Sequence, residues 1–196
     1  MKIKNLIISE NIIYISTVLL YDFDKKDKTS TTNSYKVKAN SIYKKSKLEC
    51  EKIILNNGGT VLRMTNLYGP GMSRDNVMSD IIKQLNSEKI VLKNLNAMSD
   101  FLWIEDATDA VILANNKKFN DVFNIASSKV VSIYELTKTF LELAGYNRKK
   151  IIGLKNSSKT FAPIININKA HKILNWKPTT KLETGIKYLL RNLNKL

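Results

Sequence analysis

The chain has 196 residues, 43% of them hydrophobic and 25% charged, which is typical of a folded globular protein and excludes a disordered or fibrous one. The length is enough for one domain or slightly more, and no run of about 18 apolar residues predicts a transmembrane helix. A single cysteine, Cys50, excludes an internal disulfide and a cysteine-based zinc site and fits a reducing cytoplasm.

The formal charge of +15 raises nucleic acid as a partner. However, only four of the 32 basic residues are arginines, the residue type that phosphate and base recognition favours. The lysines are spread along the whole chain. We therefore interpret the charge as a lysine-rich surface. A basic nucleic-acid binder is the less favoured alternative, and it predicts lysines that cluster in the fold.

Strands and helices are expected to alternate along the chain, which predicts an α/β fold. A buried strand covers Ile12–Ser16, and the polar stretch Asp22–Ser34 follows as a loop. A helix from about Asn40 to Asn56 then leads into a strand at Thr60–Thr65. The middle of the chain is expected to form a turn at Tyr68-Gly69-Pro70-Gly71, a helix at Asn76–Ser87, strands at Ile90–Leu92 and Phe101–Ile104, a helix at Glu105–Asn115 and a strand at Val122–Ile125. A further helix opens with the capping box Ser132…Glu135 and ends at Gly145. The last two helices are expected at Asn168–Asn175 and Lys181–Leu193, and the capping box Thr180…Glu183 opens the second of them.

Tyr43 and Lys47 form a Tyr-x-x-x-Lys pair that would lie one turn apart on the first helix. An adjacent ammonium lowers the pKa of a tyrosine, so such a pair can perform acid/base chemistry near neutrality. The spacing alone says little, because it recurs at Tyr21/Lys25, Tyr134/Lys138 and Tyr146/Lys150. Only Tyr43/Lys47 has a buried strand ending in Ser16-Thr17 some 26 residues upstream, a helix that runs on through Ile54, and the strand and turn VLRMTNLYGPG after it. The end of such a strand is where α/β sheets place their ligands.

Five segments in order resemble the extended short-chain dehydrogenase/reductase family, the NAD-dependent epimerases and dehydratases of nucleotide sugars. IIYISTVLLYD is similar to the strand that bears the family's catalytic Ser or Thr, and YKKSK is the Tyr-x-x-x-Lys motif. RMTNLYGPG matches the signature Arg-x-x-Asn-x-Tyr-Gly-Pro. DFLWIEDATDAV and NKAHKILNWKPTTKLETGI are similar to the family's D-F segment and C-terminal helices.

The resemblance implies a role for four residues. Tyr43 would exchange a proton with a sugar hydroxyl, and Lys47 would favour the ionised tyrosine and hold the ribose of the cofactor. Thr17 would hydrogen-bond the reacting oxygen, and Asn66 would contact the nucleotide sugar. The cofactor would be NAD or NADP, which carries the hydride. No metal site is expected.

The sequence departs from the family at three places. Val18-Leu19 follows Thr17 where family dehydratases carry acids, which favours an epimerase or a ketoreductase. Ser99 stands where an arginine often pairs with the diphosphate. The chain also has no G-x-G-x-x-G or G-x-x-G-x-x-G turn to bind the pyrophosphate, since Gly69-Pro70-Gly71 lacks a third glycine.

We therefore expect a partial Rossmann-type fold, a doubly wound parallel sheet without its first strands, plus a small C-terminal α/β substrate-binding part. Residues 1–72 would belong to the nucleotide-binding domain and 73–196 mainly to the substrate-binding part, with Rossmann elements interleaved at 99–126. Ile12–Ser16 would then be an apolar edge strand that favours a homo-oligomer or a complementing N-terminal half. The alternative is an inactive remnant or interaction module; either would be cytoplasmic and without a membrane partner.

Other residues have simpler interpretations. Trp103, Trp176 and Cys50 are expected to pack, and His171 is expected on a helix surface. Asp100, Glu105 and Asp106 suit loop and helix-start positions better than a metal site, and Tyr21 is a candidate to stack near the catalytic residues.

Overall fold

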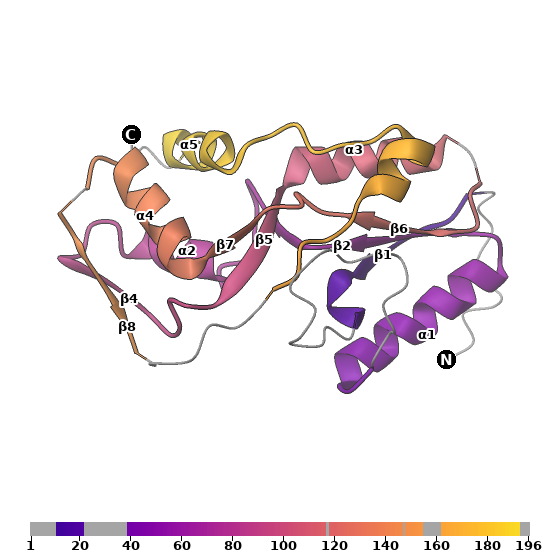
Figure 1. Cartoon of the computed structure of the whole chain (residues 1–196), viewed down its shortest axis with the longest axis horizontal. Helices are drawn as coiled ribbons and strands as arrows, with labels where there is room; N and C mark the ends of the chain where they lie inside the picture. The colour runs from indigo at the N-terminus through magenta and orange to yellow at the C-terminus, as the bar shows by residue number, and fades with distance from the viewer. Residues whose placement is uncertain (1–10, 22–38, 117, 147, 155–161, 193–196) are drawn as a thin grey trace.

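The computed structural model describes residues 11–21, 39–116, 118–146, 148–154 and 162–192. The described chain forms an elongated α/β molecule with a larger parallel sheet at one end and two smaller sheets at the other (Figure 1). The loop expected at Asp22–Ser34 lies outside the described residues.

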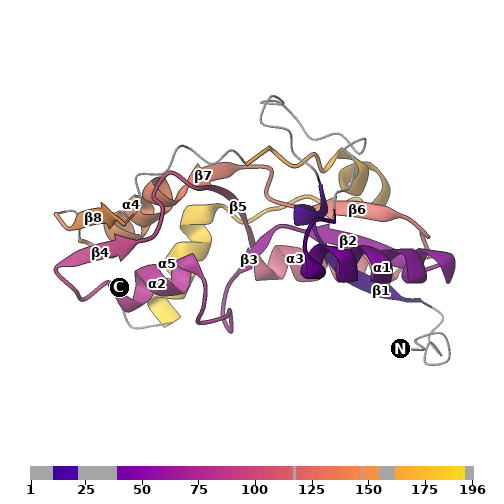
Figure 2. The ribbon, with the colours of Figure 1, turned by 90° about the horizontal axis from the view of Figure 1, so that it is seen from below.

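The larger sheet is parallel and has the order β1-β2-β6. Its strands are β1 (Ile13–Thr17), β2 (Thr60–Met64) and β6 (Val122–Ile125), with the register Ile13 opposite Thr60 and Val61 opposite Val122. The helix α1 (Ile42–Asn56) lies on one face of the sheet and α3 (Ile104–Asn115) on the other, as Figures 1 and 2 show. Every residue of β2 is buried, as expected for the central strand of a sheet covered on both faces.

Local sequence explains how α1 begins and ends. The Ser41 side chain accepts a hydrogen bond from the Lys44 amide and caps the first turn. At the other end Gly58 has a φ of 76°, a left-handed conformation that glycine adopts without strain and that ends the helix. The chain then re-enters the sheet at Thr60, whose amide donates to the Ile12 carbonyl.

The second end of the molecule contains two small sheets. β3 (Asn66–Tyr68) runs parallel to β5 (Met98–Trp103), which pairs antiparallel with β7 (Val130–Ser132). β4 (Lys89–Leu92) pairs in parallel with β8 (Lys150–Gly153). The helices at this end are α2 (Val77–Lys83), α4 (Ile133–Leu143) and α5 (Leu182–Asn192).

Two larger apolar cores among the described residues hold these layers together. One joins α2, α4 and α5 to β4 and β5 and includes the fully buried Ile81, Leu136, Phe140 and Ile186. The other lies between α3 and the larger sheet and includes Leu62, Phe123 and Trp176. Both tryptophans are buried, as the sequence predicts.

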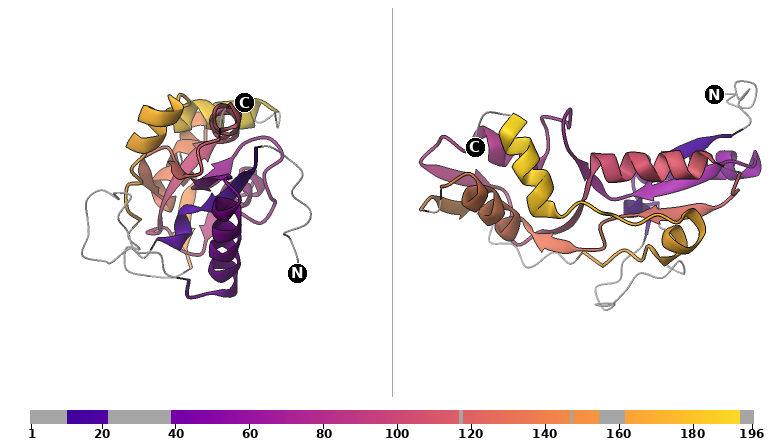
Figure 3. Two further views of the ribbon diagram at one scale, coloured as in Figure 1. Left: turned by 90° about the vertical axis from the view of Figure 1, so that its right-hand side faces the viewer. Right: turned by 90° about the horizontal axis from the view of Figure 1, so that it is seen from above.

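The C-terminal segment crosses from the second core to the first (Figure 3, right). Its first part is a single π-helical turn, η3 (Ala170–Leu174), followed by the buried Trp176. The Asp106 carboxylate accepts hydrogen bonds from the Thr179 amide (3.1 Å), the Thr179 hydroxyl (2.7 Å) and the Thr180 amide (3.0 Å). Asp106 at the start of α3 therefore anchors this segment. In the expected capping box the Glu183 side chain would accept the hydrogen bond from the Thr180 amide, whereas in the structure Asp106 accepts it.

Most expected elements are present, with a few differences in extent. The capping box Ser132…Glu135 is formed in full. The strands β3, β7 and β8 were not expected, and α2 ends at Lys83 rather than Ser87. Among the described residues, no helix combines the length and apolarity needed to cross a membrane.

Candidate active site

The C-terminal ends of two neighbouring parallel strands bring the four expected site residues to one place. Thr17 is the last residue of β1, and Asn66 follows the end of β2. Tyr43 and Lys47 lie on α1, which packs against both strands. All four line one cavity of about 310 Å³. The structure thus places the residues where parallel sheets bind their ligands.

Lys47 lies between the tyrosine and the edge of the sheet. Its ammonium donates to the Ile15 carbonyl over 2.8 Å and lies 6.0 Å from the centre of the Tyr43 ring. The Ile12 carbonyl faces β2, so by alternation the backbone groups of Ile15 point away from β2. Lys47 therefore holds its charge at the outer side of β1, next to Tyr43, whose side chain is half exposed.

Thr17 is 7% exposed, and its Oγ1 accepts a hydrogen bond of 3.2 Å from the Leu19 amide. This bond caps the short 3-10 turn η2 (Val18–Leu20). A hydroxyl that accepts one bond can still donate its hydrogen, so Thr17 can donate to an oxygen in the cavity. The neighbouring Ser16 also lines the cavity, and its buried Oγ has no hydrogen-bond partner among the described residues.

Asn66 connects this cavity to a second one. Its Nδ2 donates to the Asp100 carbonyl over 3.2 Å, and the Thr65 hydroxyl donates to the same oxygen over 3.0 Å. The second cavity, of about 460 Å³, shares Asn66 and Leu67 with the first. It extends past the turn that follows β3 and includes Ser99. Among the described residues that line the two cavities, Lys47 is the single basic side chain.

Asp100 is a buried carboxyl behind Asn66. Its Oδ1 accepts from the Ser127 amide over 3.0 Å, whereas its Oδ2 is buried with no partner among the described residues. Burial raises the pKa of Asp100 to about 6, although hydrogen bonds from the Ser127–Lys129 loop act in the opposite direction. The sequence analysis expects Asp100 at a loop or helix-start position, whereas the structure places it on β5 with its side chain buried.

Sequence reasoning missed an ion pair behind the cavity. Arg63 on β2 binds Glu51 on α1 through Nε to Oε1 (2.9 Å) and Nη2 to Oε2 (2.6 Å). The guanidinium carbon also lies 4.8 Å from the centre of the Tyr21 ring, so Tyr21 stacks here rather than in the cavity. Burial acts to lower the pKa of Arg63, but Glu51 and Tyr21 outweigh it and raise the pKa. The available signal was that Arg63 opens the segment that contains Asn66.

A dinucleotide would meet only part of a binding site on the described residues. Tyr43, Lys47 and the unpartnered Ser16 hydroxyl suit the nicotinamide end. Gly59 cannot serve as a phosphate cradle, because a Cβ there would lie 2.6 Å from the Ile54 side chain. Gly69 and Gly71 precede α2, a helix of seven residues, and line the second cavity. The described residues therefore fit the nicotinamide end but provide no Gly-rich pyrophosphate turn.

Comparison with known proteins identifies relatives of the chain. A model of the NAD dependent epimerase/dehydratase family matches residues 4–126. The chain is 27% identical to dTDP-L-rhamnose 4-epimerase of Burkholderia thailandensis over 135 residues, which are 65% of this chain and 37% of that protein. It is 29% identical to dTDP-4-dehydro-6-deoxyglucose reductase of Escherichia coli over 145 residues, 71% of this chain and 46% of that protein.

Among solved structures, the chain resembles RMD from Pseudomonas aeruginosa complexed with NADPH, with a TM-score of 0.85 at 19% identity. This match covers 93% of the chain and 66% of RMD and confirms the expected α/β fold. The chain therefore spans less than half the length of the two curated relatives and about two thirds of RMD.

Proposed function

The chain belongs to the NAD dependent epimerase/dehydratase family, and we propose that it carries the acid/base and substrate-binding residues of a nucleotide-sugar epimerase or ketoreductase. The observation that carries this proposal is the cavity of about 310 Å³ in which Thr17, Tyr43, Lys47 and Asn66 meet. The half-exposed Tyr43 and the adjacent Lys47 ammonium are the groups needed to exchange a proton with a sugar oxygen.

Each residue has a separate task in the proposed mechanism. Tyr43 gives a proton to a carbonyl oxygen on reduction and takes it from a hydroxyl on oxidation. Thr17 donates a hydrogen bond to the same oxygen, and the Lys47 ammonium stabilises the tyrosinate. NAD or NADP, when bound, accepts or supplies the hydride at the sugar carbon.

The wall of the cavity favours epimerase or ketoreductase chemistry over dehydration. Elimination of water needs an acid that protonates the departing hydroxyl. The described residues that line the cavity include no carboxylate. The two residues that follow Thr17 are both apolar, the buried Val18 and the exposed Leu19. The second cavity, of about 460 Å³, adjoins the first at Asn66, so a nucleotide sugar would span both.

The substrate is proposed to be a dTDP-linked deoxy sugar, because both curated relatives act on dTDP sugars according to their names. The test is turnover of dTDP-4-dehydro-6-deoxyglucose with NADH or NADPH, and it is measured as the loss of absorbance of the reduced nicotinamide. Epimerisation of dTDP-L-rhamnose with NAD is followed by chromatography of the sugars.

Tyr43→Phe should lower kcat by about 10²–10⁴-fold, because it removes the hydroxyl that exchanges the proton. Tyr134→Phe is the matched control, because Tyr134 is a half-exposed tyrosine of a second Tyr-x-x-x-Lys pair on α4, outside both cavities. Equal turnover by the parent and Tyr43→Phe would refute the proposed acid/base role.

A second candidate function is that of one half of a split enzyme. It is favoured by β1, which among the described residues pairs only with β2, and by the incomplete cofactor site. Calorimetry with the nucleotide sugar and with NAD(P)H separates the two candidates. Binding of the sugar alone, without turnover, would favour a complementing polypeptide or a homo-oligomer that completes the site.

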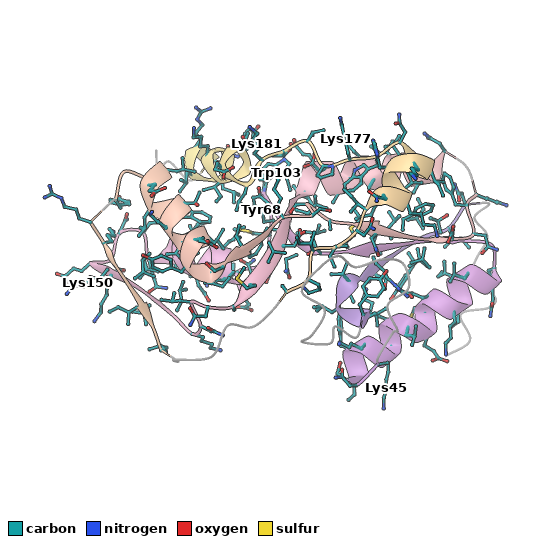
Figure 4. The ribbon with its side chains drawn as sticks, in the orientation of Figure 1. Lys45, Tyr68, Trp103, Lys150, Lys177 and Lys181 are labelled. Carbon is teal, nitrogen blue, oxygen red and sulfur yellow. The ribbon has the colours of Figure 1, made fainter. Side chains whose placement is uncertain are left out.

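A nucleic-acid role has less support. Figure 4 shows the labelled lysines on different sides of the molecule, with Lys45 below α1, Lys150 at the far end and Lys177 and Lys181 above. Such scattering is typical of a solvated surface rather than a phosphate-binding face.

A further inference from the structure

The buried pair of Arg63 and Glu51 joins the central strand to the helix that carries the proposed catalytic residues. Arg63 is 8% exposed and Glu51 is 2% exposed. Burying two charges is costly, and a well-packed apolar pair is often as stable or more stable. Stability alone is therefore a weak reason for a two-point ionic contact at this position.

The helix end of the pair is in register with the catalytic residues. Glu51 is one turn beyond Lys47 and two turns beyond Tyr43, on the same side of α1. A guanidinium fork that holds both carboxylate oxygens fixes the rotation of α1 and its position along β2. A single-point contact would leave both adjustable.

Arg63 also contacts, through Tyr21, the segment that carries Thr17. Tyr21, which is 4% exposed, stacks on the guanidinium and directly follows η2, the turn capped by Thr17. The Tyr21 hydroxyl donates to Asn124 Oδ1 on β6 over 2.6 Å, and Asn124 Nδ2 donates to the Asn166 carbonyl over 3.0 Å. The ring of Tyr21 is thus clamped between the guanidinium and the far strand of the sheet.

We propose that Arg63 is a positioning residue that sets the separation between Thr17 and the Tyr43–Lys47 pair, through Glu51 on one side and Tyr21 on the other. This inference rests on the proposed function of that cavity. Arg63 does not itself line the cavity, so it acts only through these two neighbours. Asn66 lies three residues beyond Arg63 along the chain, so Arg63 also positions this proposed substrate contact relative to α1.

The test compares variants that break the two-point contact between Arg63 and Glu51 with a variant that replaces it by apolar packing. Glu51→Gln and Arg63→Lys each remove the two-point contact, and each should lower kcat on the order of 10²-fold with little change in KM. The double variant Glu51→Leu/Arg63→Met fills the same space without charge. It should melt close to the parent temperature yet keep the low kcat, because packing is restored and the fork is not.

A matched control is Asp121→Asn, which breaks the ion pair of Asp121 with Lys169, a contact outside both cavities. It should leave kcat unchanged. Recovery of the parent kcat by the double variant would overturn the proposal, since Arg63 and Glu51 would then only stabilise the fold.

A readout independent of turnover is amide hydrogen exchange. Glu51→Gln should speed exchange in residues 17–21 and 42–56 together and leave α4 unchanged. If the parent chain shows no turnover, the proposed function fails, while the exchange comparison still decides the positioning role. Unchanged exchange in both segments would overturn it.

Discussion

Around Phe140 the buried side chains of α2, α4, α5, β4 and β5 are mostly apolar, and the polar exceptions are Ser79, Thr137 and Asp100. Between α1 and the larger sheet, by contrast, the interior holds a carboxylate, a guanidinium, a phenol and an amide, contributed by Glu51, Arg63, Tyr21 and Asn124. Apolar packing is non-directional and tolerates many sequences of similar volume. A buried polar network satisfies its groups in one geometry only. The first region is therefore suited to anchor a ligand-binding surface, and the second to hold reacting groups at fixed distances.

Removing apolar volume should have the largest effect on stability. Phe140→Ala empties a fully buried position in the first core and should lower the free energy of unfolding by about 3–5 kcal/mol in urea titrations. Tyr134→Phe, at a half-exposed position of the same helix, should stay within about 0.5 kcal/mol. A loss below about 1 kcal/mol for Phe140→Ala would show that this region is not held by packing.

Asp100 is a buried polar group that follows Ser99, a residue of the second cavity. Because burial raises its pKa to about 6, the folded protein keeps a proton that the unfolded chain releases near pH 4. The contribution of this carboxyl to stability is thus fully present below about pH 4 and lost as the pH rises through about 6.

Two pKa units correspond to about 3 kcal/mol. Asp100→Asn cannot ionise, so relative to the parent it should gain up to that amount between about pH 4 and pH 7.5. The measurement is urea unfolding of both proteins across this range. Parallel pH profiles for the two proteins would show that Asp100 titrates normally.

Asp106 anchors the segment that joins the two regions. Asp106→Asn replaces one of the two acceptor oxygens with an amide group that cannot accept from Thr179 or Thr180. It should lower the free energy of unfolding by about 2 kcal/mol. The change is followed by fluorescence of Trp176 in a Trp103→Phe background. Asp109→Asn, at an exposed position of the same helix, is the control and should have no measurable effect.

The smallest change in stability is expected at the sheet edge. Ile15 is 39% exposed on β1, so Ile15→Lys should alter the free energy of unfolding by less than about 1 kcal/mol. A charge on an edge strand opposes strand pairing. If the chain self-associates through β1, sedimentation should show a lower average mass for the variant. An unchanged mass would exclude this edge as the contact.

The sequence predicted well where a signal is local. The capping box of Ser132 and Glu135 predicts the start of α4, and the apolar run at Ile12–Ser16 predicts the strand β1. The expectation that this strand is buried was wrong, because only Ser16 and Thr17 of β1 are buried and Ile15 is exposed at the sheet edge. Sequence reasoning failed where the cause is distant in the chain. The unexpected strands β3, β7 and β8 are too short to show a period, and they form by pairing with strands elsewhere in the chain, β3 and β7 with β5 and β8 with β4.

The same limit applied to the site. Thr17, Tyr43, Lys47 and Asn66 could be selected because they lie in motifs, and the structure gathers them in one cavity. Their roles remain proposals. Glu51 could not be selected, because on the sequence it is one of many charges on a helix. Only the packing of α1 on β2 reveals its partner.

The path of the C-terminal segment has a consequence for how the chain is made. Trp176 completes the core beneath α3, and Leu190, fourteen residues later, completes the core around α4. Ribosomes release a chain from its N-terminus onward, so a nascent chain that ends before Trp176 exposes both apolar faces at once. Both cores therefore stay open until residues 176–190 have left the ribosome, and the apolar surface exposed until then is of the kind that chaperones bind.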